Sequence, residues 1–132
     1  MVMLITRPRR FSKTLGMSML EAFFDIRKDH RALFEGLEIA SHPALCAAWM
    51  NRYPTVFITL RQVEGLNFQD AYGQLLYEIA LLYQEHAYVL EGASMNEPEK
   101  QLYRRLMNRE ADRTDVLRSI EFLTQVLHKH YG

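Results

Sequence analysis

Cysteine and long hydrophobic runs are the two features in which this sequence is poorest. Cys46 is its only cysteine, so no disulfide can form within the chain, and we expect a protein of the reducing cytoplasm. No apolar stretch approaches the roughly 20 residues that cross a bilayer. The first residues also lack the basic region and long apolar core of a signal peptide. The sequence therefore argues against a disulfide-stapled scaffold and against a membrane partner.

An excess of charge of either sign is also missing. The 132 residues include 16 basic and 16 acidic side chains, for a formal net charge of +0. No global electrostatic field therefore favours nucleic acid or an anionic membrane as a partner. Hydrophobic residues make up 48% of the chain, which is ordinary for a globular protein and is enough for one modest domain.

Glycine is missing where the sequence would otherwise contain a complete phosphate-binding loop. The apolar residues 2–6 lead into a basic turn, and Lys13 and Thr14 then open an apolar helix. This order, with the spacing G-x-x-x-x-G-K-[ST], is typical of a P-loop. Arg7 and Ser12 occupy the positions of the two glycines. On the motif alone, a phosphate site and a basic loop that merely precedes a helix both remain open.

The loop carries the chemical groups that a nucleoside triphosphate requires. A helix N-terminus presents free backbone N–H groups and a partial positive charge. Lys13 would reach the β- and γ-phosphates, and the Thr14 hydroxyl would ligate Mg²⁺. Arg9 and Arg10 add donors that suit phosphate. Ser12 places a side chain where the backbone approaches phosphate closely, so nucleotide affinity depends on how that side chain is accommodated.

The hydrophobic pattern predicts two strands and several helices. Residues 2–6 and 55–60 are apolar or β-branched and predict strands. Helices are expected over residues 13–24, 44–50, 68–90, 98–108 and a last stretch that ends near residue 130. Asn67 suits the N-cap of the long helix, and Asp112 or Thr114 can cap the last one. Strands joined by helical crossovers indicate an α/β protein.

Beyond this spacing, four segments resemble the predicted AAA-ATPase-like family. Residues 6–14, Thr-Arg-Pro-Arg-Arg-Phe-Ser-Lys-Thr, resemble its variant Walker A loop, roughly [ST]-R-P-R-R-F-G-K-[ST], in which arginine also replaces the first glycine. Residues 15–24 resemble the helix that follows. Residues 33–39 resemble its L-F-x-G-L segment, and residues 53–60 resemble its second strand.

The resemblance implies an α/β ATP-binding domain of the additional-strand P-loop NTPase class, with a partial parallel sheet and flanking helices. It carries Lys13 over as a phosphate residue and Thr14 as a Mg²⁺ ligand. The other residues of the implied nucleotide-binding loop are Arg7, Pro8, Arg9, Arg10, Phe11 and Ser12. Ser12 departs from the family, which has glycine there.

The resemblance also implies parts that residues 1–132 do not contain. The family places an acidic Walker B strand after a helix that ends like His130-Tyr131-Gly132, and many members carry a nuclease-like C-terminal domain. We therefore expect a single partial domain that binds ATP and is weak or inactive in hydrolysis alone, because hydrolysis needs an acidic residue near Mg²⁺. Glu64 is the nearest carboxylate after residues 55–60 and is expected to be an exposed loop residue. Unpaired strand edges would favour self-association or a complementing downstream polypeptide.

Two other interpretations stay open. The chain could be a non-catalytic structural or interaction remnant, or its basic loop could contact nucleic acid. Against the second, no further basic stripe or exposed aromatic platform accompanies the loop. Among the remaining residues, Cys46 and Trp49 are expected to be buried. The tyrosines of the long helical stretch are expected to pack rather than to stack on bases: Tyr72, Tyr77, Tyr83 and Tyr88.

Overall fold

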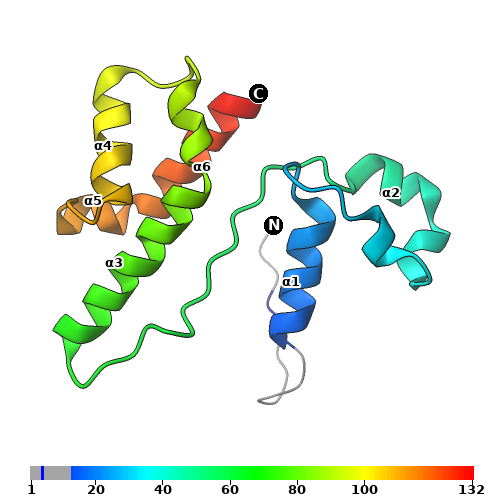
Figure 1. The fold of residues 1–132 in the computed structure, drawn as a ribbon, viewed down its shortest axis with the longest axis horizontal. Helices are drawn as coiled ribbons and strands as arrows, with labels where there is room; N and C mark the ends of the chain where they lie inside the picture. Colours follow the sequence, from blue (N-terminus) through cyan, green and yellow to red (C-terminus); the bar gives the residue numbers. More distant parts are fainter. Residues whose placement is uncertain (1–3, 5–12) are drawn as a thin grey trace. The chain divides into compact units, whose positions relative to one another are not determined.

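The computed structural model of the chain describes Leu4 and residues 13–132. The chain divides into two compact units, Met1–Thr55 (unit 1) and Val56–Gly132 (unit 2). Figure 1 shows both as helices joined by loops. Among the described residues, no helix is long and apolar enough to cross a membrane.

The described part of unit 1 consists of two α-helices and two 3-10 turns. Its elements are α1 (Lys13–Phe24), η1 (Arg31–Phe34), η2 (Glu38–Ser41) and α2 (Pro43–Trp49). Pro43 stands in the first turn of α2, where its missing N–H costs nothing. Phe23 and Phe34 are buried and meet edge to face, with ring centroids 5.4 Å apart. This aromatic pair links the end of α1 to the turn that follows it.

Unit 2 is an assembly of helices around one hydrophobic core. Its elements are α3 (Phe68–Glu85), η3 (Ala87–Glu91), α4 (Glu97–Met107), α5 (Arg113–Leu117) and α6 (Ser119–Tyr131). Helices α3 and α4 pack against each other, as Figure 1 shows. The buried members of the core are Ile79, Leu82, Tyr83, Val89, Met95, Tyr103, Leu106, Val116, Leu123, Val126 and Leu127.

Side-chain caps fix where the helices of unit 2 begin. Asn67 accepts a 3.0 Å hydrogen bond from the Asp70 amide and begins α3, as predicted. Of the two candidates for the other cap, Asp112 and Thr114, the structure uses Asp112, which accepts a hydrogen bond from the Asp115 amide at 2.9 Å. It begins the short helix α5, which ends before α6. The predicted long helix also ends early, at Glu85, and η3 continues the chain.

The predicted α/β class with a partial parallel sheet is wrong for the described part of the chain. Its regular elements are helices, and its only β feature is an isolated parallel bridge between Asp25 and Tyr53. Residues 55–60, predicted as a strand, contain no strand. Val56 and Ile58 pack instead against the helical core of unit 2. β-branched residues favour an extended chain, but a strand also needs a hydrogen-bonded neighbour. The other predicted strand, residues 2–6, lies outside the described residues except for the exposed Leu4.

Candidate functional site

Lys13 and Thr14 are the part of the predicted nucleotide-binding loop that the structure describes. They are the first two residues of α1, and the predicted helix over residues 13–24 is confirmed. The Thr14 carbonyl accepts a 2.9 Å hydrogen bond from Ser18 Oγ. The Thr14 hydroxyl makes no hydrogen bond to a described residue. The remaining predicted residues lie outside the described part: Arg7, Pro8, Arg9, Arg10, Phe11 and Ser12.

The opposite end of α1 is held by the short segment Asn51 to Tyr53. The Asn51 amide donates to the Phe23 carbonyl at 2.6 Å, and the Tyr53 amide donates to the Phe24 carbonyl at 2.9 Å. A third hydrogen bond runs in the opposite direction: the Ile26 amide, just after the helix, donates to the Tyr53 carbonyl at 2.8 Å. These bonds satisfy carbonyl groups that a helix end otherwise leaves without partners.

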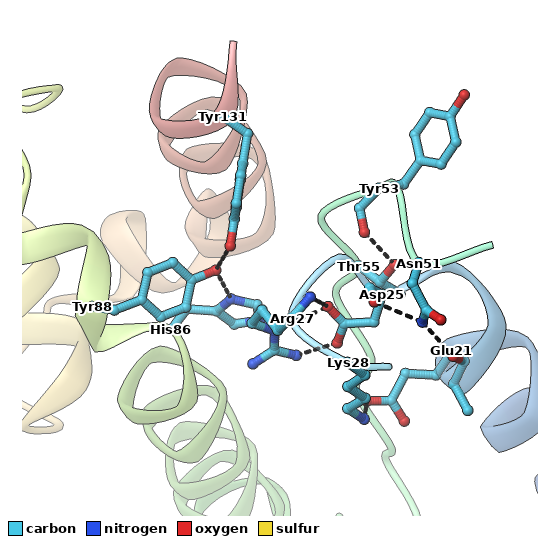
Figure 2. A network of polar contacts seen from close by, with 11 residues as sticks. Glu21, Asp25, Arg27, Lys28, Asn51, Tyr53, Thr55, His86, Tyr88 and Tyr131 are labelled. Atoms are coloured by element: carbon cyan, nitrogen blue, oxygen red, sulfur yellow. Dashed lines mark hydrogen bonds and ion pairs between the residues drawn. The ribbon is translucent and has the colours of Figure 1, made fainter. Parts of the chain in front are cut away.

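The Asn51 side chain adds a second set of bonds at the same helix end. Its Nδ2 donates to the carbonyl oxygens of Ala22, at 2.9 Å, and Asp25, at 3.0 Å (Figure 2). The backbone of Asn51 has φ of 54°, a left-handed conformation that asparagine adopts more readily than most residues. Asn51 therefore acts as a side-chain cap supplied from elsewhere in the sequence.

A buried carboxylate completes this anchor. Asp25 is fully buried, and its Oδ1 accepts from the backbone amide of Arg27 at 3.0 Å and from its Nε at 3.1 Å (Figure 2). Burial by itself raises the pKa of Asp25, but the hydrogen bonds and charge of Arg27 outweigh it, so the pKa lies below its ordinary value. Next to this pair, Lys28 Nζ donates to Glu21 at 2.7 Å.

Aromatic rings cover the anchored end of α1. Phe24 meets Tyr53 at 6.4 Å between centroids, and Trp49 stacks on Tyr53 at 5.4 Å. Trp49 remains 46% exposed, so its predicted place in the core is wrong. Cys46 is half-buried, and its thiol donates to the Ile39 carbonyl at 3.4 Å. Unit 1 thus fixes α1 through its C-terminal end, while Thr14 at the other end is exposed.

Unit 2 has its own buried polar groups, which join helices. The Tyr83 hydroxyl donates to the Ser119 carbonyl at 2.5 Å, and the Tyr103 hydroxyl donates to the Tyr83 carbonyl at 2.7 Å. Burial raises the pKa of both tyrosines, and Tyr103 raises that of Tyr83 further. Both hydroxyls therefore stay protonated and serve as structural donors. The expectation that tyrosines of this stretch pack is confirmed for Tyr83 in the core and for Tyr72 and Tyr88 against it, whereas Tyr77 is 50% exposed.

A second hydrogen-bonded group lies near the end of α6. The Tyr131 hydroxyl donates to the Tyr88 hydroxyl at 2.7 Å, and that oxygen lies 3.2 Å from His86 Nδ1 (Figure 2). These contacts fasten the last turn of the helix to η3.

Carboxylates do not gather into a metal site in the part of the chain that the structure describes. No group of three or more His, Cys, Asp or Glu residues there could hold a metal ion. Glu64 is exposed, as predicted, and it lines an open groove of about 1080 Å³ beside the first turns of α3.

Sequence reasoning missed the anchor of α1. In the sequence, little distinguishes Asp25, Arg27 and Asn51 from the other residues of the segments between helices. Asn51 is distant in sequence from the carbonyls that it caps, so no local pattern reveals its role. The short spacing between Asp25 and Arg27 was the one available signal of a paired carboxylate.

The chain belongs to the predicted AAA-ATPase family, because a family model described as Predicted AAA-ATPase matches residues 1–120. Membership in this family implies, in general terms, the use of a nucleotide and a metal ion. Comparison with the curated proteins and with the solved structures gives no significant match.

Proposed function

We propose that this protein binds ATP with Mg²⁺ through residues 7–14. The observation that carries the proposal is that α1 begins with Lys13 and Thr14, and that three arginines stand a few residues before them in the sequence, at positions 7, 9 and 10. Membership of residues 1–120 in the predicted AAA-ATPase family supports the same assignment. In the proposed site, Lys13 contacts the β- and γ-phosphates, and the Thr14 hydroxyl ligates Mg²⁺.

The first turn of α1 suits an anionic ligand on physical grounds. Its leading amides have no partners within the helix, and the helix dipole places partial positive charge there. No acidic side chain stands in the first turn. Because the Thr14 hydroxyl has no partner among the described residues, it remains able to ligate a cation. Mg²⁺ is commonly held by few protein groups together with substrate phosphates, so the absence of a carboxylate cluster among the described residues does not argue against it.

Turnover by this chain alone is proposed to be slow. Phosphoryl transfer to water requires an acidic residue near the metal and a group that orients the water. Residues 55–60 are followed by Arg61, Gln62 and Val63 rather than by an acidic pair, and Glu64 is exposed. A Lys13-dependent ATPase rate on the order of 1 per second would contradict this part of the proposal.

Titration with a fluorescent ATP analogue tests the site. We expect Lys13→Ala and Thr14→Ala to weaken binding in Mg²⁺ by at least about tenfold, which corresponds to roughly 1.4 kcal/mol. Removal of Mg²⁺ should weaken the wild type but change Thr14→Ala little. Lys100→Ala is the matched control, since Lys100 lies in α4 and makes no ion pair with a described residue.

Two results would replace the proposal by another function. If the wild type binds no nucleotide, the non-catalytic interpretation holds. If nucleotide has no effect but Arg9→Ala and Arg10→Ala abolish a salt-dependent affinity for DNA, the basic loop contacts nucleic acid.

A further inference from the structure

Residues 55–59 form an extended segment whose alternate side chains have different surroundings. Val56 and Ile58 pack against the hydrophobic core of unit 2. Phe57, between them, is half-buried and is not a member of that core, and Thr59 is exposed. Val56, Phe57 and Ile58 are all half-buried, so what alternates is contact with the core, and that alternation has the period of two of an extended strand.

The backbone of this segment lacks the partners that a strand requires. No backbone N–H or carbonyl of residues 56–59 makes a backbone hydrogen bond to a residue in the described part of the chain. The side chains at its two ends bond locally: Thr55 Oγ1 donates to the Tyr53 carbonyl at 3.1 Å, and Thr59 Oγ1 accepts from the Arg61 amide at 3.3 Å. Buried backbone polar groups are nearly always paired in folded proteins, and those of a half-buried segment are paired either with water or with a neighbouring chain. The segment therefore presents an edge suited to another extended chain.

The sequence of the segment is complementary to itself. Its sequence, Thr-Val-Phe-Ile-Thr, is nearly the same in both directions. A threonine stands at each end, a β-branched apolar residue follows it on each side, and Phe57 is at the centre. If two copies run antiparallel about a two-fold axis at Phe57, Phe57 faces Phe57, Val56 faces Ile58, and Thr55 faces Thr59. Aromatic, β-branched and threonine pairs of this kind stabilise antiparallel strands, and no charge enters the interface.

We propose that residues 55–59 pair with the same residues of a second copy of the chain, antiparallel and about a two-fold axis at Phe57. Such an interface is isologous, because the same surface serves both copies. It is short, so the dimer dissociates on dilution. The proposal is independent of nucleotide binding, since none of residues 7–14 takes part.

Sedimentation of the full chain over a dilution series tests the pairing. The wild type is expected to show a monomer–dimer equilibrium. Phe57→Lys and Phe57→Glu should each be monomeric, because two like charges would face each other at the axis. An equimolar mixture of the two variants should form a dimer again, since lysine then faces glutamate. Amide hydrogen exchange at residues 56–59 should slow as the wild-type concentration rises.

A control variant tests whether an added charge anywhere on the surface prevents dimerisation. Leu117→Lys introduces the same charge at a side chain that is 78% exposed in α5, and it should dimerise like the wild type. Far-UV circular dichroism reports whether each variant is folded. A wild type that stays monomeric at every concentration would overturn the proposal. So would a folded Phe57→Lys protein that dimerises normally, or a mixture of folded variants that does not associate.

Discussion

Asp25 is the residue whose ionisation has the clearest consequence for unit 1. Its pKa is lower in the folded chain than in the unfolded chain because Arg27 stabilises the carboxylate. The stabilising effect is therefore present above the unfolded pKa, near about 4, and is lost as pH falls through the folded pKa. We expect Asp25→Asn to destabilise the protein by about 2–4 kcal/mol at neutral pH, because one partner of a buried pair is removed. Urea unfolding at about pH 7 and about pH 3 should show a smaller difference at the lower pH.

The control for Asp25 is the exposed Asp29. Its side chain is 81% exposed and lies 3.8 Å from Arg31, so Asp29→Asn should have little effect at either pH. An equal loss of stability for the two variants, or a loss for Asp25→Asn that does not depend on pH, would show that the buried pair does not act as argued.

Ser12 is the residue on which the affinity of the proposed nucleotide site depends. The family resemblance places glycine there, and a side chain at this position crowds the approach of backbone to phosphate. We expect Ser12→Gly to lower the dissociation constant for the ATP analogue by roughly threefold to tenfold, up to about 1.4 kcal/mol. Ser12→Ala keeps the Cβ and should bind like the wild type. If alanine improves binding as much as glycine does, the hydroxyl rather than the backbone approach is the obstacle.

At the scale of elements, two glycines around the start of α3 should respond in opposite ways to alanine. A Cβ at Gly73, inside the helix, would meet nothing within 4 Å, whereas one at Gly65 would lie 2.5 Å from Asp70 Cβ and 2.9 Å from the Ala71 nitrogen. Gly73→Ala should therefore raise the free energy of unfolding by about 0.5–1 kcal/mol. Gly65→Ala should lower it by about 1–3 kcal/mol. Denaturant unfolding of both variants checks the pair, and a Gly73→Ala protein no more stable than wild type would contradict it.

The elements that the sequence predicts correctly are those decided by local chemistry. Asn67 caps α3 as the sequence predicts, because a short polar side chain at a helix start can bond an amide within the next turn. Asp112 caps in the same way, but it begins α5 and not the last helix that the sequence predicts for it. The helix over residues 13–24 is also predicted correctly, from the apolar stripe along its sequence. These features need no knowledge of distant residues.

The elements that the sequence predicts wrongly depend on distant partners. Residues 55–60 have strand propensity, but the described part of the chain supplies no neighbouring strand for them. The side chain of Asn51 caps α1 across a long stretch of sequence, and no periodicity reports such a contact. For the same reason nothing local in the sequence indicates the anchor that holds the C-terminal end of α1, whereas the nucleotide-binding role of residues 7–14 stays a prediction.

At the scale of the whole molecule, the described parts of the two units differ in how much hydrophobic core each one holds. Every buried member of the main hydrophobic cluster belongs to unit 2, between Ile79 and Leu127. In the described part of unit 1, the buried apolar side chains are Phe23 and Phe34. Burial of apolar surface is the main favourable term in folding. Unit 2 should therefore carry most of the folding cooperativity of the chain.

This difference predicts that residues 56–132 fold without unit 1. The fragment should keep a helical circular dichroism spectrum and a single cooperative urea transition. Leu123 is fully buried, so Leu123→Ala should cost about 2–5 kcal/mol, and the cost should be the same in the fragment as in the full chain. Leu117→Ala, at a side chain that is 78% exposed, should change neither protein much. A fragment without a cooperative transition, or a Leu123→Ala cost that falls sharply when unit 1 is removed, would mean that the core of unit 2 depends on the rest of the chain.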